Sequence, residues 1–449
     1  MRLGELDSVL PATSRRIAVI GGGIAGLASA WLLASRYQVT LFEAGHYVGG
    51  HTNTVDVCVD DRHAAVDTGF LVFNRRTYPN LCALFDLLGV EAAESEMSFS
   101  VSLAAPDLEW AGTSLATLFA QQRNIARPAF LRMVADIVRF NRATTRMARE
   151  GGIPDESLGD YLARERYGAG FRDWYLLPMA AAIWSCPTGT MLAYPLATFV
   201  RFCHNHGLLQ ILDRPQWLTV SGGGRSYVQR MLARLDDVRV GLGVQRAERR
   251  PDGVLLHTRA GAERFDEVVF ACHSDQTLAI LGADASGDER RVLGAVRYQD
   301  NLAVLHTDTD LLPRRRAAWS AWNYLAGEGA PDARPVSVSY LINRLQPLPF
   351  DTPVMVSLNP FREPAERKVI ERFHYAHPIF DQAAIEAQAA LPQLQGRRRS
   401  WFAGAWTGYG FHEDGLKSAI AVCERLAVPI PWRAASLNPA SHIGQAVPA

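Results

Sequence analysis

Three glycines and an acid near the start of the chain have the spacing of a dinucleotide-binding motif. Gly21, Gly23 and Gly26 follow an apolar, β-branched run, residues 16–20, and precede an apolar stretch that is typical of a helix. The first glycine permits a tight turn, the second lets a pyrophosphate approach the backbone, and the third lets the helix pack on the strand. Glu43 ends the next apolar run, where a carboxylate accepts hydrogen bonds from a ribose diol.

The residues around this motif narrow the choice of dinucleotide. No arginine or lysine follows Glu43 within the next few residues, which disfavours a 2′-phosphate and therefore NADP. NAD and FAD both remain open on this evidence. A second glycine pair, Gly49-Gly50, comes shortly after the acid and lets the chain pass close to a long cofactor. Residues 16–52 therefore predict a Rossmann-like unit of strand, helix and strand.

The composition is that of an ordinary globular protein with two domains. A chain of 449 residues exceeds what one core organises, and its 46 basic and 46 acidic residues cancel. This balance removes any bulk electrostatic argument for a nucleic-acid partner. The six cysteines lack metal-ligand spacing, so we expect free thiols, no metal site and a reducing cytoplasm. We see neither a signal peptide nor an apolar run of about 18 residues.

Residues 78–217 are predicted to be mostly helical. In residues 128–149 the apolar side chains gather on one face, and the opposite face carries Arg132, Arg139, Arg142 and Arg146. Such a face either contacts anionic lipid at a membrane surface or is simply solvated. Two further helical stretches, residues 173–184 and 192–212, are rich in aromatic residues, which either wall an apolar tunnel or belong to an ordinary core.

The remaining chain alternates between strands and helices. A strand and glycine cluster at residues 217–224 precede three strand-like runs, which suggest a return to the nucleotide domain. Further strands at 301–306, 336–341 and 353–357 predict a second sheet. A last strand, glycine and helix follow at residues 400–427, and the proline-rich end is predicted to lack its own fold.

With these pieces in order, residues 15–427 resemble the flavin-containing amine oxidase superfamily. The strings GHTNT at 50–54, RPQWLTV at 214–220 and GYGFHEDG at 408–415 are similar to a bacterial branch related to the flavoprotein domain fused to plant cyclopropane fatty acid synthases. The resemblance implies an α/β fold. A Rossmann-like FAD-binding domain of the glutathione-reductase type is combined with a discontinuous α+β substrate domain, as in amine oxidases and phytoene desaturases.

The resemblance also implies how the domains divide the chain. Three segments, 15–77, 218–275 and 399–428, would form the FAD-binding domain. The substrate domain would consist of the mostly helical segment 78–217 and the mixed sheet of 276–398. Residues 1–14 are expected to form a loose arm and residues 429–449 a flexible tail.

Carried over by position, the resemblance predicts noncovalent FAD and the residues that hold it. His51 stands where relatives commonly have arginine, and the helix that opens at Gly415-Leu416 would direct its N–H groups at the flavin C2 carbonyl. Val244 would contact the adenine edge through its backbone. The expected cofactor-binding residues are Gly21, Gly23, Ile24, Ala25, Gly26, Glu43, Ala44, Gly49, Gly50, His51, Thr52, Gly69, Phe70, Val244, Gly404, Ala405, Gly415 and Leu416.

Two departures from the family pattern concern the chemistry. The lysine that amine oxidases place near flavin N5 is missing from residues 300–306, and His412 takes the place of an aromatic residue over the flavin. Both differences argue against amine oxidation. We predict that His412, with a pKa near neutral, acts as a base and that Glu413 or Asp414 orients it. The alternative is that His412 and Glu413 cap the following helix.

The absence of a second dinucleotide motif in the sequence implies that the substrate supplies the electrons. We expect an FAD-dependent oxidoreductase, a dehydrogenase or desaturase that removes hydride from a fatty acyl chain of the methyl-branched or cyclopropane type. One alternative is a flavin amine oxidase that acts on a monoamine or polyamine. Another is a flavin-stabilised, non-redox partner of a lipid methyltransferase. We expect a cytoplasmic protein with peripheral contact to an anionic inner membrane face.

Overall fold

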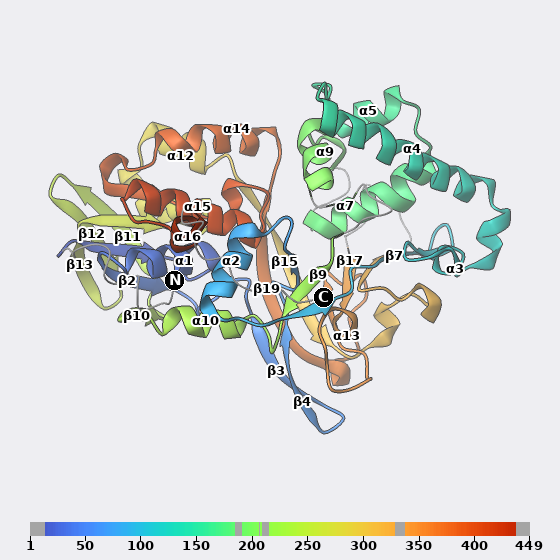
Figure 1. Cartoon of the computed structure of the whole chain (residues 1–449), viewed down its shortest axis with the longest axis horizontal. Helices are drawn as coiled ribbons and strands as arrows, with labels where there is room; N and C mark the ends of the chain where they lie inside the picture. Colours follow the sequence, from blue (N-terminus) through green and yellow to red (C-terminus); the bar gives the residue numbers. More distant parts are fainter. Residues whose placement is uncertain (1–13, 185–190, 206, 209–214, 328–336, 437–449) are drawn as a thin grey trace, which may run out of the picture.

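The computed structural model describes residues 14–184, 191–205, 207–208, 215–327 and 337–436. The first thirteen residues of the expected arm, Arg214 of the RPQWLTV string, parts of the expected helix 192–212 and the tail after residue 436 lie outside this part of the chain. Figure 1 shows a parallel sheet with its helices at one side and a group of helices at the other. The long antiparallel strands β15 (Arg297–His306) and β19 (Val369–Ile379) lie between them.

The parallel sheet contains the predicted strand, helix and strand unit. Its central strand β1 contains Ile17, Ala18 and Val19, which are fully buried because both faces of the sheet are covered. Three separate stretches of chain contribute strands to this sheet. In order across the sheet, the strands are β10 (Asp237–Val240), β2 (Gln38–Glu43), β1 (Arg16–Ile20), β14 (Glu267–Phe270) and β20 (Ser400–Phe402).

Alternate residues of β1 belong to two different core clusters. Ile17 and Val19 pack with helices α1 (Ile24–Leu33) and α15 (His412–Arg425) on one face. Ala18 and Ile20 pack on the other face with an antiparallel sheet and with helices α11, α12 and α14. The bounds of these elements are β11 (Val244–Arg250), β12 (Gly253–Thr258), β13 (Gly261–Phe265), α11 (Ser274–Leu281), α12 (Gly287–Leu293) and α14 (Gln382–Ala390).

A larger mixed sheet forms the centre of the other half of the molecule. Its strands are antiparallel apart from the parallel pair β16 and β7, so residues 99–111 join a sheet built mainly from residues 297–379. The order is β19 (Val369–Ile379), β15 (Arg297–His306), β18 (Met355–Leu358), β17 (Ser337–Leu341), β16 (Trp322–Ala326), β7 (Phe99–Leu103) and β8 (Leu108–Ala111).

The remaining helices and strands complete the two halves. Among the helices that group at one side in Figure 1, α7 lies against the mixed sheet, where the Tyr340 hydroxyl donates to the Ala182 carbonyl. Across both halves of the molecule, the other α-helices are α2 (Pro79–Leu88), α3 (Leu115–Leu118), α4 (Pro128–Glu150), α5 (Leu158–Arg164), α6 (Ala169–Phe171), α7 (Leu177–Trp184), α9 (Leu196–Asn205), α10 (Arg225–Leu232), α13 (Ile342–Leu345) and α16 (Pro431–Ser436). The strands are β3 (Thr54–Val59), β4 (Arg62–Asp67), β5 (Phe73–Asn74), β6 (Ala92–Ser95) and β9 (Trp217–Val220).

The amphipathic helix predicted at 128–149 is confirmed as α4. Its buried residues, including Phe130, Met133 and Phe140, recur at the spacing of one helical face, and Arg142 and Arg146 are exposed. No helix among the described residues has the length and apolar character needed to cross a bilayer.

The structure corrects two predictions near the C-terminus. Helix α15 begins at His412, not at Leu416, because the Asp414 carboxylate accepts hydrogen bonds from the Phe411 and Tyr409 amides and closes the first turn earlier. Residues 431–436 form α16, which docks on α2, where the Trp432 indole donates to Asn80. Pro431 suits the first turn of this helix, so the prolines there start an element instead of preventing one.

Candidate active site

The glycine turn lies at the N-terminus of α1, and its glycines serve different purposes. A Cβ atom on Gly26 would overlap the carbonyl oxygen of Gly21, and one on Gly21 would lie 2.9 Å from the Ala271 carbonyl. Both glycines are therefore needed by the fold itself. A Cβ atom on Gly23 would meet nothing within 4 Å, because this position faces open space at the helix N-terminus. Gly23 is the place where a pyrophosphate has room to approach.

Glu43 is held at the end of β2 by two backbone amides. Its carboxylate accepts hydrogen bonds from Gly22 and Gly45, each 2.7 Å long. An ionised carboxylate accepts about four hydrogen bonds, so lone pairs remain for a ribose diol. Ala44 and Val244 line the same cavity beside Glu43, and together they form the end that suits an adenosine.

The second glycine pair packs directly on the first glycine turn. The Gly49 amide donates to the Gly22 carbonyl at 2.9 Å, and a Cβ atom on Gly50 would lie 3.0 Å from the Cα atom of Gly23. Gly69 is equally tight, because a Cβ atom there would overlap the His51 carbonyl. Three loops that are distant in sequence therefore meet, backbone against backbone, beside one cavity.

That cavity has a volume of about 1300 Å³ and extends from Glu43 to the helices of the other half. It is larger than the roughly 300–1000 Å³ that is usual for one small ligand. Most of the predicted cofactor-binding residues line it: Gly21, Gly23, Ile24, Ala25, Glu43, Ala44, Gly49, Gly50, His51, Gly69, Phe70, Val244, Gly404 and Ala405, as does His412. The remaining predicted residues, Gly26, Thr52, Glu413, Gly415 and Leu416, lie behind the cavity wall.

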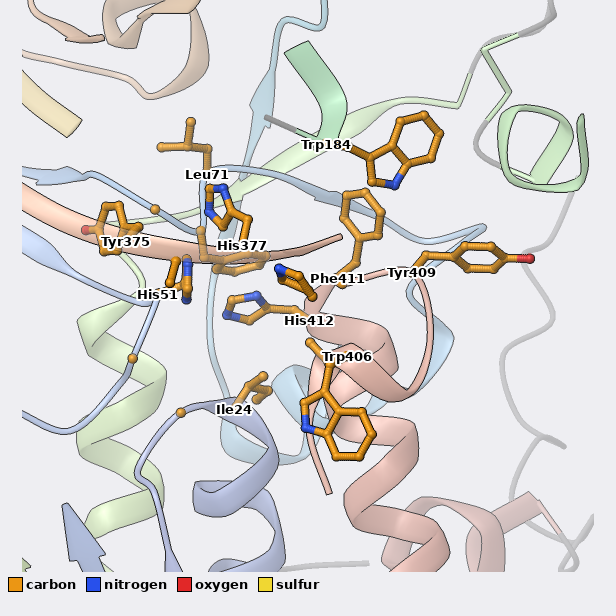
Figure 2. A pocket seen from close by; sticks show the side chains of 18 of the residues that line it. Ile24, His51, Leu71, Trp184, Tyr375, His377, Trp406, Tyr409, Phe411 and His412 are labelled. Carbon is orange, nitrogen blue, oxygen red and sulfur yellow. The ribbon is translucent and has the colours of Figure 1, made fainter. Parts of the chain in front are cut away.

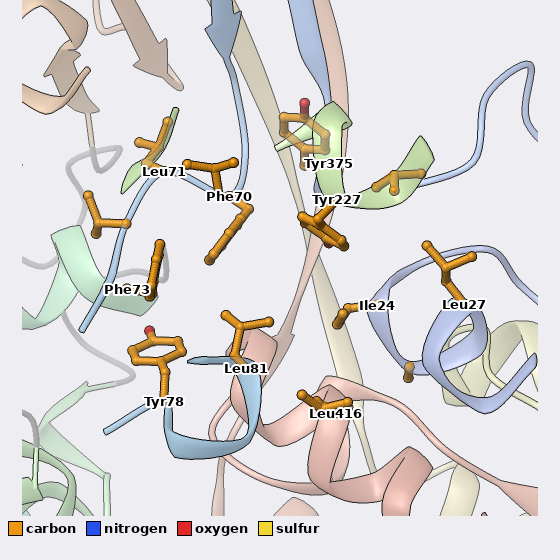
Figure 3. Packing of buried hydrophobic residues seen from close by; sticks show 14 of the residues in the cluster. Ile24, Leu27, Phe70, Leu71, Phe73, Tyr78, Leu81, Tyr227, Tyr375 and Leu416 are labelled. Carbon is orange, nitrogen blue, oxygen red and sulfur yellow. The ribbon is translucent and has the colours of Figure 1, made fainter. Parts of the chain in front are cut away.

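The first turns of α15 and α1 meet at Gly415. A Cβ atom on Gly415 would lie 2.8 Å from the Ile24 side chain, so glycine is required for this close approach. Figure 3 shows Leu416 and Ile24 in the apolar core between the two helices. Gly415 and Leu416 therefore position the helix start, while Phe411 and His412 reach the cavity. Two helix N-termini converge on the cavity, which favours bound negative charge.

His412 lies in the cavity wall between the glycine turn and the aromatic part of the cavity (Figure 2). Its ring stacks on Phe70 at 3.7 Å between centroids, and its Nε2 atom is 2.9 Å from the Thr52 hydroxyl. Tyr227 in turn bonds to Thr52 at 2.6 Å. Burial lowers the pKa of His412 to about 3, so the expectation of a pKa near neutral is wrong. The imidazole is neutral at neutral pH.

Glu413 does not orient His412, and this prediction is corrected by the hydrogen bonds of its carboxylate. One oxygen accepts from the backbone and side-chain amides of Asn80, and the other accepts from the Leu81 amide at 3.0 Å. Glu413 thus caps the N-terminus of α2, while Asp414 caps α15. The partner of the His412 ring is Thr52. Glu413 therefore does cap a helix, as the alternative predicted, but the capped helix is α2 and not α15.

We expect Glu413→Gln to lower the free energy of unfolding by about 2 kcal/mol, since the amide loses the charge at the α2 N-terminus and at most one oxygen accepts. Thermal unfolding of the variant measures this loss. The rate at which substrate bleaches the bound cofactor should stay at the wild-type value. A variant with wild-type stability and a slowed rate would restore a catalytic role for Glu413.

A cluster of aromatic rings beside His51 was not anticipated from the sequence. His51 stacks on Tyr375 at 4.9 Å and lies 5.1 Å from the His377 ring, between centroids. Burial lowers the pKa of His377 to about 4 and the pKa of His51 well below its usual value. The Nε2 atom of His51 is buried, with no hydrogen-bond partner among the described residues. The sequence did contain one indication of this cluster. Tyr375 and His377 are two residues apart in a strand, so their side chains lie on the same face of β19.

Beyond His412 the cavity wall becomes aromatic. The sequence left open whether the aromatic helices line a cavity or belong to the core, and the structure shows that they do both. Trp184 of α7 and Phe202 of α9 line the cavity and also belong to the core cluster that contains Phe199. The sheet supplies further aromatic lining, including Trp322.

Charged side chains are scarce in this wall. Among the described lining residues the carboxylates are Glu43, bound to amides, and Glu96, paired with Arg344 at 2.8 Å. The two lysines of the sequence lie elsewhere: Lys368 is paired with Asp308 at 2.8 Å, and Lys417 is 4.0 Å from Glu413. Among the described residues the cavity therefore has no lysine, and its one carboxylate without a cationic partner is Glu43, which two backbone amides hold at the adenosine end.

Comparison with known proteins agrees with this architecture. Residues 19–88 match the family described as NAD(P)-binding Rossmann-like domain. No curated protein sequence matches the chain. Its fold is similar to the crystal structure of a fatty acid isomerase from P. acnes that produces CLA, with a TM-score of 0.65 and 16% identity over 92% of this chain and 98% of the other.

Two amine oxidases have the same fold. Cyclohexylamine oxidase from Brevibacterium oxydans is 17% identical, with a TM-score of 0.64 over 92% of this chain and 100% of its own. Putrescine oxidase bound to putrescine is 16% identical, with a TM-score of 0.64 over 93% and 100%. The chain therefore has the amine oxidase-type fold. The fold expected from the resemblance to the flavin-containing amine oxidase superfamily is confirmed.

Proposed function

We propose that the protein is an FAD-dependent oxidoreductase that removes hydride from a carbon atom of an apolar substrate. One observation carries this proposal: a single cavity joins the dinucleotide-binding glycine turn to an aromatic chamber, and His412 lies between them. A cofactor in the first part and a substrate in the second would meet at His412. When bound, FAD supplies the hydride acceptor.

The residues present fit FAD. Gly23 leaves room for the pyrophosphate, and Glu43 has lone pairs for the ribose. Four buried nitrogen atoms in the lining have no hydrogen-bond partner among the described residues, and a long ligand would supply partners: His51 Nε2 and the indole Nε1 atoms of Trp184, Trp322 and Trp406. The start of α15 favours the negative charge that collects on a reduced flavin. We propose noncovalent binding.

We propose a fatty acyl chain of the methyl-branched or cyclopropane type as the substrate. The aromatic wall suits an alkyl chain, and the fatty acid isomerase with the same fold acts on a fatty acid. In the proposed desaturation, hydride leaves one carbon for the cofactor and a proton leaves the adjacent carbon, so a C=C bond forms. Oxygen, a quinone or a protein carrier takes up the two electrons.

His412 is the proposed proton acceptor. If its Nε2–H donates to Thr52, Nδ1 keeps a free lone pair. Burial opposes a charged imidazolium, as the pKa of about 3 indicates, so the proton acceptor needs negative charge nearby. A bound cofactor that has taken up hydride would supply such charge, so we expect the proton to reach His412 only as hydride leaves the substrate.

Amine oxidation is the second candidate, favoured by the shared fold with cyclohexylamine oxidase and putrescine oxidase. The lining argues against it, because the described wall has no lysine and both of its carboxylates are engaged, Glu96 by Arg344 and Glu43 by backbone amides. A flavin-stabilised, non-redox partner of a lipid methyltransferase is the third candidate.

Anaerobic mixing of the flavin-loaded protein with substrates separates these candidates. We expect extracted acyl lipid to bleach the flavin absorbance and putrescine or cyclohexylamine to leave it unchanged, since the cavity matches an alkyl chain and not an ammonium group. Bleaching by an amine alone, with hydrogen peroxide released in air, would support amine oxidation. No bleaching by any of them would support the non-redox partner.

A further inference from the structure

One end of the molecule exposes large apolar side chains close together in the sequence. Leu115 is 75% exposed, Ile125 is 57% exposed and Leu131 is 46% exposed. They lie on α3, on the 3₁₀ turn Gln122–Ala126 and in the first turn of α4, which form the right-hand end of the molecule in Figure 1. We call these three residues the apolar tip. Exposed groups of this kind mark contacts with another surface.

The elements that carry the apolar tip are held together by internal packing. Phe119, directly after α3, lies 5.9 Å from the ring of Phe130 in α4, and Phe130 is fully buried. The Ser114 hydroxyl caps α3. The Asp107 carboxylate binds both Arg123 and Arg314, so the segment at 314–316 is tied to the same end. The apolar tip therefore projects from a packed base.

The segments that form and adjoin the apolar tip contain more arginines than acids. Residues 110–135 contain Arg123, Arg127 and Arg132 and no acid, and Arg314, Arg315 and Arg316 adjoin them. Three acids offset part of this charge: Asp107 binds Arg123 and Arg314, buried Glu109 pairs with Arg315 at 2.7 Å, and Asp136 lies 3.8 Å from Arg132. Six arginines against three acids leave an excess of positive charge. Arg316 lies over the Trp319 ring at 5.3 Å and makes no ion pair among the described residues. Exposed aliphatic side chains on segments with an excess of arginine suit an anionic lipid surface.

An exposed part of the cavity lining lies next to the apolar tip. Gly112 and Thr113 line the cavity, are exposed and directly precede Ser114 and α3. We propose that the apolar tip docks on an anionic lipid bilayer and so places this part of the cavity lining against the membrane. The entry of acyl chains by this route rests on the proposed function, but the docking itself does not.

The arginine face of α4 is a less suitable docking surface than its sequence pattern indicates. Arg139 binds Asp136 at 3.1 Å, donates to the Glu165 carbonyl at 2.9 Å and lies over the Tyr167 ring at 3.8 Å. It therefore holds its own domain together. Arg142 and Arg146 are exposed, but this face offers charge without the apolar side chains that enter a bilayer.

Sedimentation of the full-length, flavin-loaded protein with vesicles tests the proposal. We expect binding to phosphatidylglycerol vesicles that weakens in high salt and is poor on phosphatidylcholine. The double variant Leu115→Ser/Ile125→Ser should bind phosphatidylglycerol vesicles about tenfold more weakly or worse, since two side chains no longer enter the apolar layer. Val240→Ser is the matched control, because Val240 is 46% exposed on the edge strand β10 of the parallel sheet, and its binding should be unchanged.

Several outcomes would overturn the proposal. Wild-type protein that ignores anionic vesicles, or a double variant that binds as tightly as wild type, would do so. Binding lost only in Arg142→Glu/Arg146→Glu would assign the contact to α4. A double variant that changes only the oligomeric state would make the apolar tip a contact between copies. Bleaching of the flavin by acyl substrate in detergent is read separately, so failure of docking and failure of the proposed function are distinguishable.

Discussion

Replacing Gly23 by valine is expected to produce a folded protein that no longer binds FAD. The backbone at Gly23 is extended, with φ of −69°, and its Cβ position meets nothing within 4 Å, so the fold tolerates a side chain. The same space is where the pyrophosphate would approach the α1 N-terminus. We expect at least a roughly hundredfold loss of FAD affinity, measured by flavin fluorescence titration of the apoprotein.

Gly26→Ala is the informative comparison for this experiment. Its Cβ atom would overlap the Gly21 carbonyl, so α1 must move away from the β1 turn and stability must fall. We therefore expect a lowered thermal midpoint in the apoprotein of Gly26→Ala and an unchanged midpoint in the apoprotein of Gly23→Val. A Gly23→Val protein that purifies yellow, with normal FAD content, would contradict the placement of the cofactor.

Replacing His412 by alanine is expected to slow flavin reduction by acyl substrate by about 10²- to 10⁴-fold while FAD stays bound. The physical reason is the loss of the proposed proton acceptor from the point where the two parts of the cavity meet. Stopped-flow absorbance under nitrogen measures the rate. Glu413→Gln is the control on the adjacent residue, because its carboxylate caps α2 and faces away from the reaction.

The pH dependence of this rate follows from the pKa of His412. Burial lowers that pKa to about 3, so the neutral, proton-accepting form is fully present above about pH 5 and is lost only as the pH falls through about 3. The wild-type reduction rate should therefore show no acid limb near the ordinary histidine pKa. Release of FAD from His412→Ala, or a wild-type rate that halves near that ordinary pKa, would contradict this role.

Local sequence patterns were sufficient for the elements whose chemistry is local. The glycine turn, the carboxylate at Glu43 and the two-faced helix α4 each depend on residues within about one element and its neighbours. The strand order of the parallel sheet was not predicted from the sequence, because it depends on pairing between distant segments. The overall fold was expected from the resemblance to a known family, and that resemblance rested in part on the order of these elements.

The polar contacts of the site could not be derived in the same way. Glu413 lies next to His412 in the sequence, yet successive residues of a helix point in different directions, and its carboxylate is directed to α2. Thr52 is 360 residues away from His412 and is its hydrogen-bond partner. No local pattern specifies such pairs, because they depend on how separate elements pack.

By itself the sequence of this protein determined the dinucleotide-binding turn and the acid that follows it, because backbone conformation and hydrophobic periodicity act over short distances. Only the tertiary structure decided that burial lowers the pKa of His51, His377 and His412. It also decided that Tyr375 and His377 lie beside His51, and that the cavity continues from the glycine turn into an aromatic chamber. These properties arise from burial and from contacts between distant segments, and burial exists only once the chain has folded.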